Sequence, residues 1–186
     1  MGRFEFSFAP IEGVCVVERK RIGDSRGSFS RMFCVEDLAA VNWTKSIAQI
    51  NHTVNKKSGT VRGMHFQRPP YAEMKLVSCL RGAVWDVAVD LRAGSPTFLK
   101  WHAEVLSADN LCAMLIPEGC AHGYQTLTDD VELLYFHSVA YEPSAEGGVN
   151  PHDPRIGIAW PLVITEMSAR DLNHAHVSDH FEGLTL

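Results

Sequence analysis

The stretch Gly59-Thr-Val-Arg-Gly-Met-His-Phe-Gln67, followed at once by Arg68-Pro-Pro-Tyr71, carries the most information about the fold. Val61 and the neighbouring glycine predict a strand, in which successive side chains point to opposite faces. His65 would then share a face with positions 63 and 67, while Arg62 would lie on the other. A histidine on the inner face of a strand, near a guanidinium and an amine, suits proton transfer on an anionic substrate. The segment alone leaves open a core histidine held by one hydrogen bond.

Most of the remaining chain consists of short β-patterned segments separated by turn residues. The run Ala83-Val-Trp-Asp-Val-Ala-Val-Asp-Leu91 alternates, which puts Asp86 and Asp90 on the same side. About eight to twelve such segments predict a sandwich or a barrel rather than βαβ units. Short helices are expected at Val35–Val41 and after Ser168, which can act as an N-cap.

Composition excludes several classes of protein. A chain of 186 residues predicts one domain, covering residues 1–186. The net charge of −5 gives a nucleic-acid partner no electrostatic support. The longest apolar runs are too short to span a bilayer. The five cysteines are scattered and form no CxxC pair, a pattern typical of the reducing cytoplasm.

A second motif, Pro117-Glu-Gly-Cys-Ala-His122, places a histidine after a tight turn, and it is similar to the second half-motif of the cupin superfamily. Metal-binding cupins pair that histidine with a His-x-His from an earlier strand. Here position 63 is glycine and position 67 is glutamine, so His65 stands alone and no metal is expected. The chain also lacks a dinucleotide or phosphate-binding glycine motif, so no bound nicotinamide is expected.

Further motifs follow one another in an order that is typical of a known protein family. They are Asp24-x-Arg-Gly-x-Phe29, Gly59 to Gln67, Pro69-Pro70, Lys75-Leu-Val77, Asp86-Val-Ala-Val-Asp90, Gly94-Ser-Pro-Thr-Phe98, Ile116 to Tyr124, Leu134-Tyr135, His152-Asp-Pro154, Trp160-Pro-Leu162 and Ser168-Ala-Arg-Asp171. Together they closely resemble the dTDP-4-dehydrorhamnose 3,5-epimerase family, from about residue 10 to about residue 175. Each motif alone is weak evidence, whereas their joint order and spacing are specific.

The resemblance implies an all-β, cupin-like jelly roll (a double-stranded β-helix) with short flanking helices. It further implies an isomerase that needs neither cofactor nor metal and that forms homodimers by exchanging strands. The implied substrate is a nucleoside-diphosphate-linked 4-keto-6-deoxy sugar, whose C4 carbonyl acidifies the protons on C3 and C5. A base removes such a proton, the enolate is stabilised, and an acid protonates the opposite face.

By this resemblance His65 is the base, Asp171 its hydrogen-bonded partner, Lys75 the group that stabilises the enolate, and Tyr135 the acid. Arg62 would contact the diphosphate, because a guanidinium fork matches its oxygens. The other positions implied to bind substrate are Arg26, Phe29, Arg31, Gln49, Asn51, Asp86 and His122. Asp86 would also orient Lys75.

Several residues depart from the family pattern. Arg31 stands where a glutamate usually helps to hold thymine, and Ala140 stands where a tyrosine stacks on the base. Tyr141 next to it should face the other way. Ile50 and Phe136 replace an aspartate and a lysine. The sequence therefore suggests a nucleoside other than thymidine, such as guanosine or cytidine, with the deprotonation chemistry retained.

Three other readings stay open. The enzyme could act at C3 or C5 alone, or move the ketone as an isomerase does, on the same sugar or a GDP- or CDP-linked one. The chain could instead be a catalytically idle jelly roll that binds a sugar nucleotide. A metal-dependent cupin is the third, and it predicts metal in stoichiometric amount.

Overall fold

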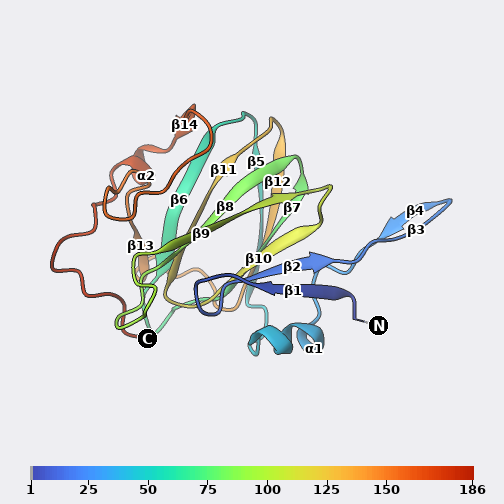
Figure 1. Cartoon of the computed structure of the whole chain (residues 1–186), viewed down its shortest axis with the longest axis horizontal. Coiled ribbons are helices and arrows are strands. Elements are labelled where there is room, and N and C mark those ends of the chain that lie inside the picture. Colours follow the sequence, from blue (N-terminus) through green and yellow to red (C-terminus); the bar gives the residue numbers. More distant parts are fainter. Residues whose placement is uncertain (1) are drawn as a thin grey trace.

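The computed structural model describes residues 2–186, and two β-sheets form the body of the molecule (Figure 1). The first sheet has the strand order β1 (Phe4–Phe8), β2 (Cys15–Arg19), β10 (Cys112–Ile116), β7 (Lys75–Arg81), β12 (Val131–His137) and β5 (Gln49–Asn55). The second has the order β13 (Glu146–Gly148), β6 (Thr60–Gln67), β11 (Cys120–Thr126), β8 (Ala83–Asp90) and β9 (Trp101–Ser107). The short strand β14 (Glu166–Met167) adds to β6 in parallel, and the other pairs are antiparallel.

The remaining elements are short. The strands β3 (Ile22–Asp24) and β4 (Gly27–Phe29) form a hairpin of their own. The helices are α1 (Val35–Leu38), which continues as the 3₁₀ turn η1 (Ala39–Val41), and α2 (Ala169–Leu172). None of the helices between residues 2 and 186 has the length and apolarity needed to cross a membrane. The structure thus confirms an all-β architecture with short helices.

The space between the sheets holds one part of the core, and the alternation of β8 shows how it is filled. Val84 and Ala88 point into this space, whereas Val87 and Val89 point to the outer side. Asp86 therefore faces the interior of the sandwich, as the sequence predicted. An acid in that position requires a partner, because an unpaired charge is costly to bury.

Both outer faces are also covered. On the first sheet, α1 and η1 contribute Leu38 and Val41 to a cluster with Trp43 and Phe136. On the second sheet, the C-terminal segment contributes residues such as Val177 to a cluster with strand side chains. The two sheets therefore pack against each other on their inner faces and against other segments on their outer faces.

Strand β6 corrects one sequence prediction. His122 of β11 pairs with His65, and Tyr124 pairs with Arg62, so two residues of β6 oppose the single residue Gly123. This is a β-bulge, which shifts the alternation by one residue. Arg62 and His65 consequently line the same cavity, and the prediction that they occupy opposite faces was wrong.

The β3–β4 hairpin extends away from the two sheets (Figure 1). Its side chains are exposed at every strand position, and Phe29 is 60% exposed. An exposed phenylalanine at the tip of a projecting hairpin is poorly suited to water, which makes this hairpin a candidate for contact with another surface.

Candidate active site

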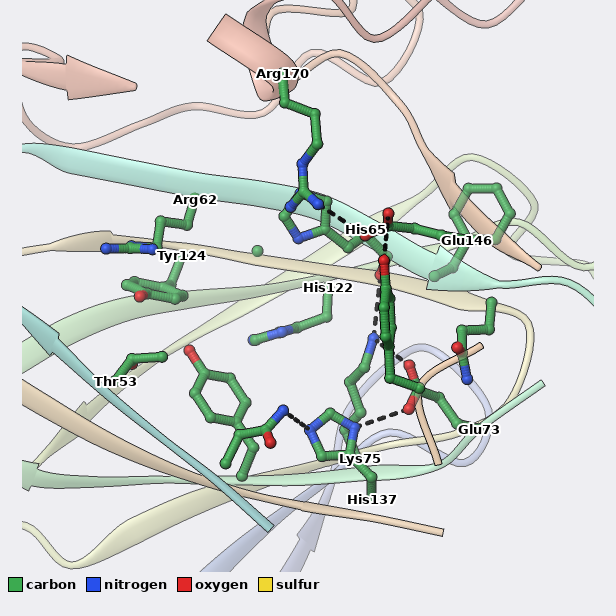
Figure 2. Close-up of a pocket in the computed structure, with 16 residues that line it drawn as sticks. Thr53, Arg62, His65, Glu73, Lys75, His122, Tyr124, His137, Glu146 and Arg170 are labelled. Carbon is green, nitrogen blue, oxygen red and sulfur yellow. Dashed lines mark hydrogen bonds and ion pairs between the residues drawn. The ribbon is translucent and has the colours of Figure 1, made fainter. Parts of the chain in front are cut away.

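A cavity of about 290 Å³ lies between the sheets and is lined mainly by polar side chains (Figure 2). Its walls are formed by Asn51, Thr53, Arg62, His65, Phe66, Gln67, Glu73, Lys75, His122, Gly123, Tyr124, Tyr135, His137, Tyr141, Glu146 and Arg170. The structure thus brings together six of the residues predicted to act on or bind a substrate. They are Asn51, Arg62, His65, Lys75, His122 and Tyr135.

His65 and Asp171 form the predicted pair, with Nε2 of His65 2.8 Å from Oδ1 of Asp171. The start of α2 places the carboxylate, because Ser168 caps this helix by accepting the backbone N–H of Asp171 at 3.0 Å. The backbone N–H of Gly63 donates to the other carboxylate oxygen at 3.2 Å. Burial opposes the charge of Asp171, but the hydrogen bonds from His65 and Gly63 outweigh it and lower the pKa of Asp171 to about 2. Asp171 is therefore an anion.

The contact fixes the tautomer of His65. An anionic acceptor at 2.8 Å is the strongest partner available, so Nε2 carries the proton and Nδ1 keeps its lone pair. An NH₂ group of Arg170 also lies 3.2 Å from Nε2, where it adds positive charge beside the ring. His65 can thus act as a base through Nδ1.

A second histidine adjoins this pair. Nε2 of His174 lies 3.9 Å from Oδ1 of Asp171, and its ring meets that of His65 edge to face. Burial is the largest cause that lowers the pKa of His174, followed by the charge of His65. His65, Asp171 and His174 form the one cluster with metal-ligand spacing in the part of the chain that the structure describes. The Arg170 guanidinium beside His65 disfavours a further cation there, since like charges repel at this distance.

The opposite sheet contributes Lys75 from β7 and Tyr135 from β12. Tyr135 is buried, which raises its pKa well above the usual value, and the neighbouring phenol of Tyr124 adds to the effect. Its hydroxyl therefore keeps its proton at neutral pH. A base and a protonated phenol thus approach the cavity from opposite sheets.

Asp86 does not orient Lys75, which corrects the prediction. Oδ1 of Asp86 instead contacts Nε2 of His122 at 2.7 Å. Burial raises the pKa of Asp86, although His122 opposes this effect. Glu73 takes the predicted role, with Oε1 3.1 Å from Nζ of Lys75 (Figure 2). The sequence held a signal for Glu73, because residues two apart in an extended segment share a face.

The rim of the cavity is formed by linked polar residues (Figure 2). Arg62 donates through Nε to Asn55 at 2.8 Å, and Arg170 donates to Glu146 at 3.0 Å. The hydroxyl of Tyr141 donates to the same Glu146 at 3.0 Å. Tyr141 was expected to face away, but its side chain lines the cavity. The predicted orientation of Tyr141 was wrong because the chain leaves regular strand geometry after β12, so the alternation rule no longer applies.

Gln49 lies beside the cavity and donates to Asn51 at 2.9 Å. Three other predicted residues do not reach it. Arg26 pairs with Asp24 in the exposed hairpin, and Phe29 lies on the same hairpin. Arg31 pairs with Asp37 of α1 at 2.9 Å. Within one chain, these three side chains do not meet the cavity residues.

The geometry can be compared with known proteins. A family model described as dTDP-4-dehydrorhamnose 3,5-epimerase matches residues 9–179. The chain belongs to this family. Both the predicted family and the jelly-roll fold are confirmed, and the chain is of the isomerase class.

Among curated relatives, the dTDP-4-dehydrorhamnose 3,5-epimerase of Salmonella typhimurium is 43% identical over 163 residues, which are 87% of this chain and 88% of the relative. A dTDP-4-dehydrorhamnose 3-epimerase of Streptomyces niveus is 40% identical over 162 residues, which are 87% of this chain and 78% of the relative. Among solved structures, the Bacillus anthracis dTDP-4-dehydrorhamnose 3,5-epimerase with TDP and PPi bound has a TM-score of 0.90 at 33% identity. The match covers 94% of this chain and 99% of that one.

Proposed function

We propose that the protein epimerises a nucleoside-diphosphate-linked 4-keto-6-deoxy sugar at C3 and C5 without a cofactor. The observation that carries the proposal is the cavity that His65, held by Asp171, shares with Lys75 and Tyr135 of the opposite sheet. Membership of the epimerase family supports the same reaction. The C4 ketone of such a sugar already acidifies the C–H bonds on both sides, so the residues need only move protons and stabilise an enolate.

The base in this scheme is His65. Its Nδ1 takes the proton from C3 or C5, and the electron pair of the broken C–H bond moves toward the C4 oxygen. The resulting imidazolium is stabilised by Asp171, whose carboxylate already holds Nε2–H at 2.8 Å. The ammonium of Lys75 stabilises the negative charge on the C4 oxygen.

Tyr135 returns a proton to the same carbon from the opposite face, which inverts the configuration. Its raised pKa keeps the phenol protonated until a carbanion forms next to it. The phenolate then regains a proton from solvent, and His65 releases one, so no net proton is consumed.

The diphosphate is assigned to the two guanidinium groups at the rim, Arg62 and Arg170. Arg62 is anchored through Nε by Asn55, and Arg170 is anchored by Glu146. Both side chains line the cavity that contains His65, and guanidinium groups match phosphate oxygens well.

Exchange with solvent tests the function. In D₂O, the wild-type protein given dTDP-4-keto-6-deoxyglucose should introduce deuterium at both C3 and C5, as NMR would resolve. His65→Asn should lower the exchange rate by about 10²- to 10⁴-fold, the usual contribution of a general base. Absence of label, or an unchanged rate in His65→Asn, would reject the proposed chemistry.

One relative supports an alternative, epimerisation at a single carbon. The Streptomyces niveus relative is named as a 3-epimerase and is 40% identical to this chain. Label at C3 alone in the same experiment would assign single-carbon epimerisation, and a ketone moved from C4 would indicate a ketoisomerase. A sugar nucleotide that binds without any exchange would indicate a non-catalytic protein.

The identity of the nucleoside that carries the sugar is a separate prediction. Arg31 and Ala140 are the departures that suggest guanosine or cytidine, but Tyr141 lines the cavity and could stack on a base in place of residue 140. We propose thymidine diphosphate as the carrier for this reason, and because the family is named for it. Competition between dTDP- and GDP-linked substrates decides the question, and a preference for GDP would restore the sequence prediction.

A homodimer in the cytoplasm completes the proposal. Strand β5 is an open edge of the first sheet, where Ile50 is 54% and Val54 45% exposed. Such an edge needs a cover, and a second copy of the chain provides one. The five cysteines are free thiols, which fits a reducing compartment.

A further inference from the structure

The ammonium of Lys75 contacts two protein groups, one carboxylate and one backbone carbonyl. Nζ lies 3.1 Å from Oε1 of Glu73 and 3.2 Å from the backbone oxygen of His65. The side chains of Lys75 and Glu73 are only 8% and 9% exposed. Since an ammonium has three N–H groups, these contacts leave one for the cavity.

The carboxylate of Glu73 is itself held in place. Its second oxygen lies 2.8 Å from Nδ1 of His137, which pairs with Lys75 across the two strands β12 and β7 (Figure 2). Glu73 thus bridges two strand residues that face each other. Burial opposes the charge of Glu73, but Lys75 and His137 together lower its pKa, so it remains an anion.

Further hydrogen bonds connect His137 to Asn51, Gln49 and Tyr141. Asn51 lies 3.3 Å from Nε2 of His137, and Gln49 donates to Asn51 at 2.9 Å. Gln49 in turn accepts the backbone N–H of Tyr141 at 2.9 Å. If Nδ1 of His137 donates to Glu73, its Nε2 accepts from Asn51, so each group has its proper role. A chain of contacts therefore runs from Tyr141 at the rim to the ammonium of Lys75.

We propose that Glu73, locked by His137, is a positioning residue that aims the free N–H of Lys75 at the C4 oxygen of the sugar. The inference rests on the proposed function, in which that oxygen becomes an enolate. Lysine side chains lose much rotamer freedom when fixed, and a fixed donor stabilises the enolate without having to reorganise during the reaction.

The charged groups around Lys75 come from several elements. Glu73 precedes β7, His137 lies on β12, and the Asp86–His122 pair faces Lys75 from the second sheet. Of these, Glu73 is the only anion in direct contact with the ammonium among residues 2–186. Removing its charge should therefore release the ammonium from the position in which Glu73 holds it.

Glu73→Gln tests the proposal, because the amide keeps the size and one acceptor oxygen but not the charge. We expect kcat to fall about 10- to 100-fold with KM within about 3-fold of the wild type, as for a displaced catalytic group. Lys75→Ala gives the upper limit of the loss, and Glu104→Gln, on β9 outside the cavity, should behave as wild type.

His137 supplies an independent route if Glu73→Gln does not fold. His137→Gln keeps a donor toward Glu73 and should retain most of kcat, whereas His137→Ala should lower kcat as Glu73→Gln does. A Glu73→Gln protein with the kcat of the wild type would overturn the inference. So would a His137→Ala protein with unchanged kcat. If the wild type itself exchanges no sugar proton with D₂O, the proposed function has failed instead.

Discussion

At the scale of single residues, the proposed reaction requires Asp171 to act through one nitrogen of His65. Asp171 is 2.8 Å from Nε2, its side chain is 3% exposed, and its own backbone N–H is bound by Ser168. The carboxylate cannot reach a sugar from this position without losing its contacts with His65 and with the backbone N–H of Gly63. Its effect on catalysis must therefore pass through the tautomer and the charge of the imidazole.

Asp171→Asn should separate this role from a purely structural one. An amide that offers N–H to Nε2 favours the tautomer with the proton on Nδ1, the atom that must be free to act as base. We expect kcat to fall by about 10²- to 10⁴-fold with the fold retained. Measuring kcat and KM together with circular dichroism checks this, and a kcat within a few-fold of the wild type would contradict the assigned geometry.

The same carboxylate should be visible in acid unfolding. Its pKa is lowered from 3.8 to about 2 in the folded chain, so the stability it contributes is complete above pH 3.8 and is lost as the pH falls toward 2. After allowance for solvent screening, this amounts to about 1–2 kcal/mol. The free energy of unfolding of Asp171→Asn, followed between pH 2 and 6, should lack that component.

How far such roles could be predicted depends on where their partners lie in the sequence. His65, Lys75, Tyr135 and Asp171 stand in motifs whose order marks them as candidates, and their catalytic roles stay predictions. The role of His137 could not be foreseen, because its contact with Glu73 depends on the register between β12 and β7. Side-chain pairing across strands far apart in the chain leaves no local pattern.

At the scale of elements, the bulge in β6 determines which side chains face the cavity. The alternation rule placed Arg62 and His65 on opposite faces because it counts every residue once. Two glycines, Gly63 and Gly123, allow the strands to approach closely at the bulge, and no propensity scale reveals such an approach. The all-β class was predictable, although the structure has fourteen strands where eight to twelve were expected, and this irregularity was not.

Gly63→Ala should therefore damage both fold and activity. Gly63 has φ of +127°, and an added Cβ would lie 2.5 Å from Cα of Gly123. We expect a loss of about 2–4 kcal/mol from strain and crowding, measured by urea unfolding. Gly94→Ala is the matched control, because Gly94 also has positive φ, +71°, but its added Cβ meets nothing within 4 Å. That control should lose only about 1–2 kcal/mol, and equal losses would show that crowding at the bulge is unimportant.

At the scale of the whole molecule, the candidate binding residues fall into two groups. One group lines the cavity, while Arg26 and Phe29 lie on the β3–β4 hairpin that extends away from it (Figure 1). The sequence could name both groups but could not say that they are separated in one chain. A dimer in which each hairpin reaches the cavity of the partner would reunite them and would bury the exposed Phe29.

Complementation between two inactive variants tests this arrangement. Arg26→Ala with Phe29→Ala impairs the hairpin, and His65→Asn impairs the cavity. If each hairpin serves the partner, a doubly tagged heterodimer of the two chains contains one intact site, and roughly half of the wild-type activity should return. If the hairpin serves its own cavity, both sites of the heterodimer stay defective and no activity returns. A monomer by light scattering at micromolar concentration would reject the dimer itself, and with it any role for the hairpin in the site of a second chain.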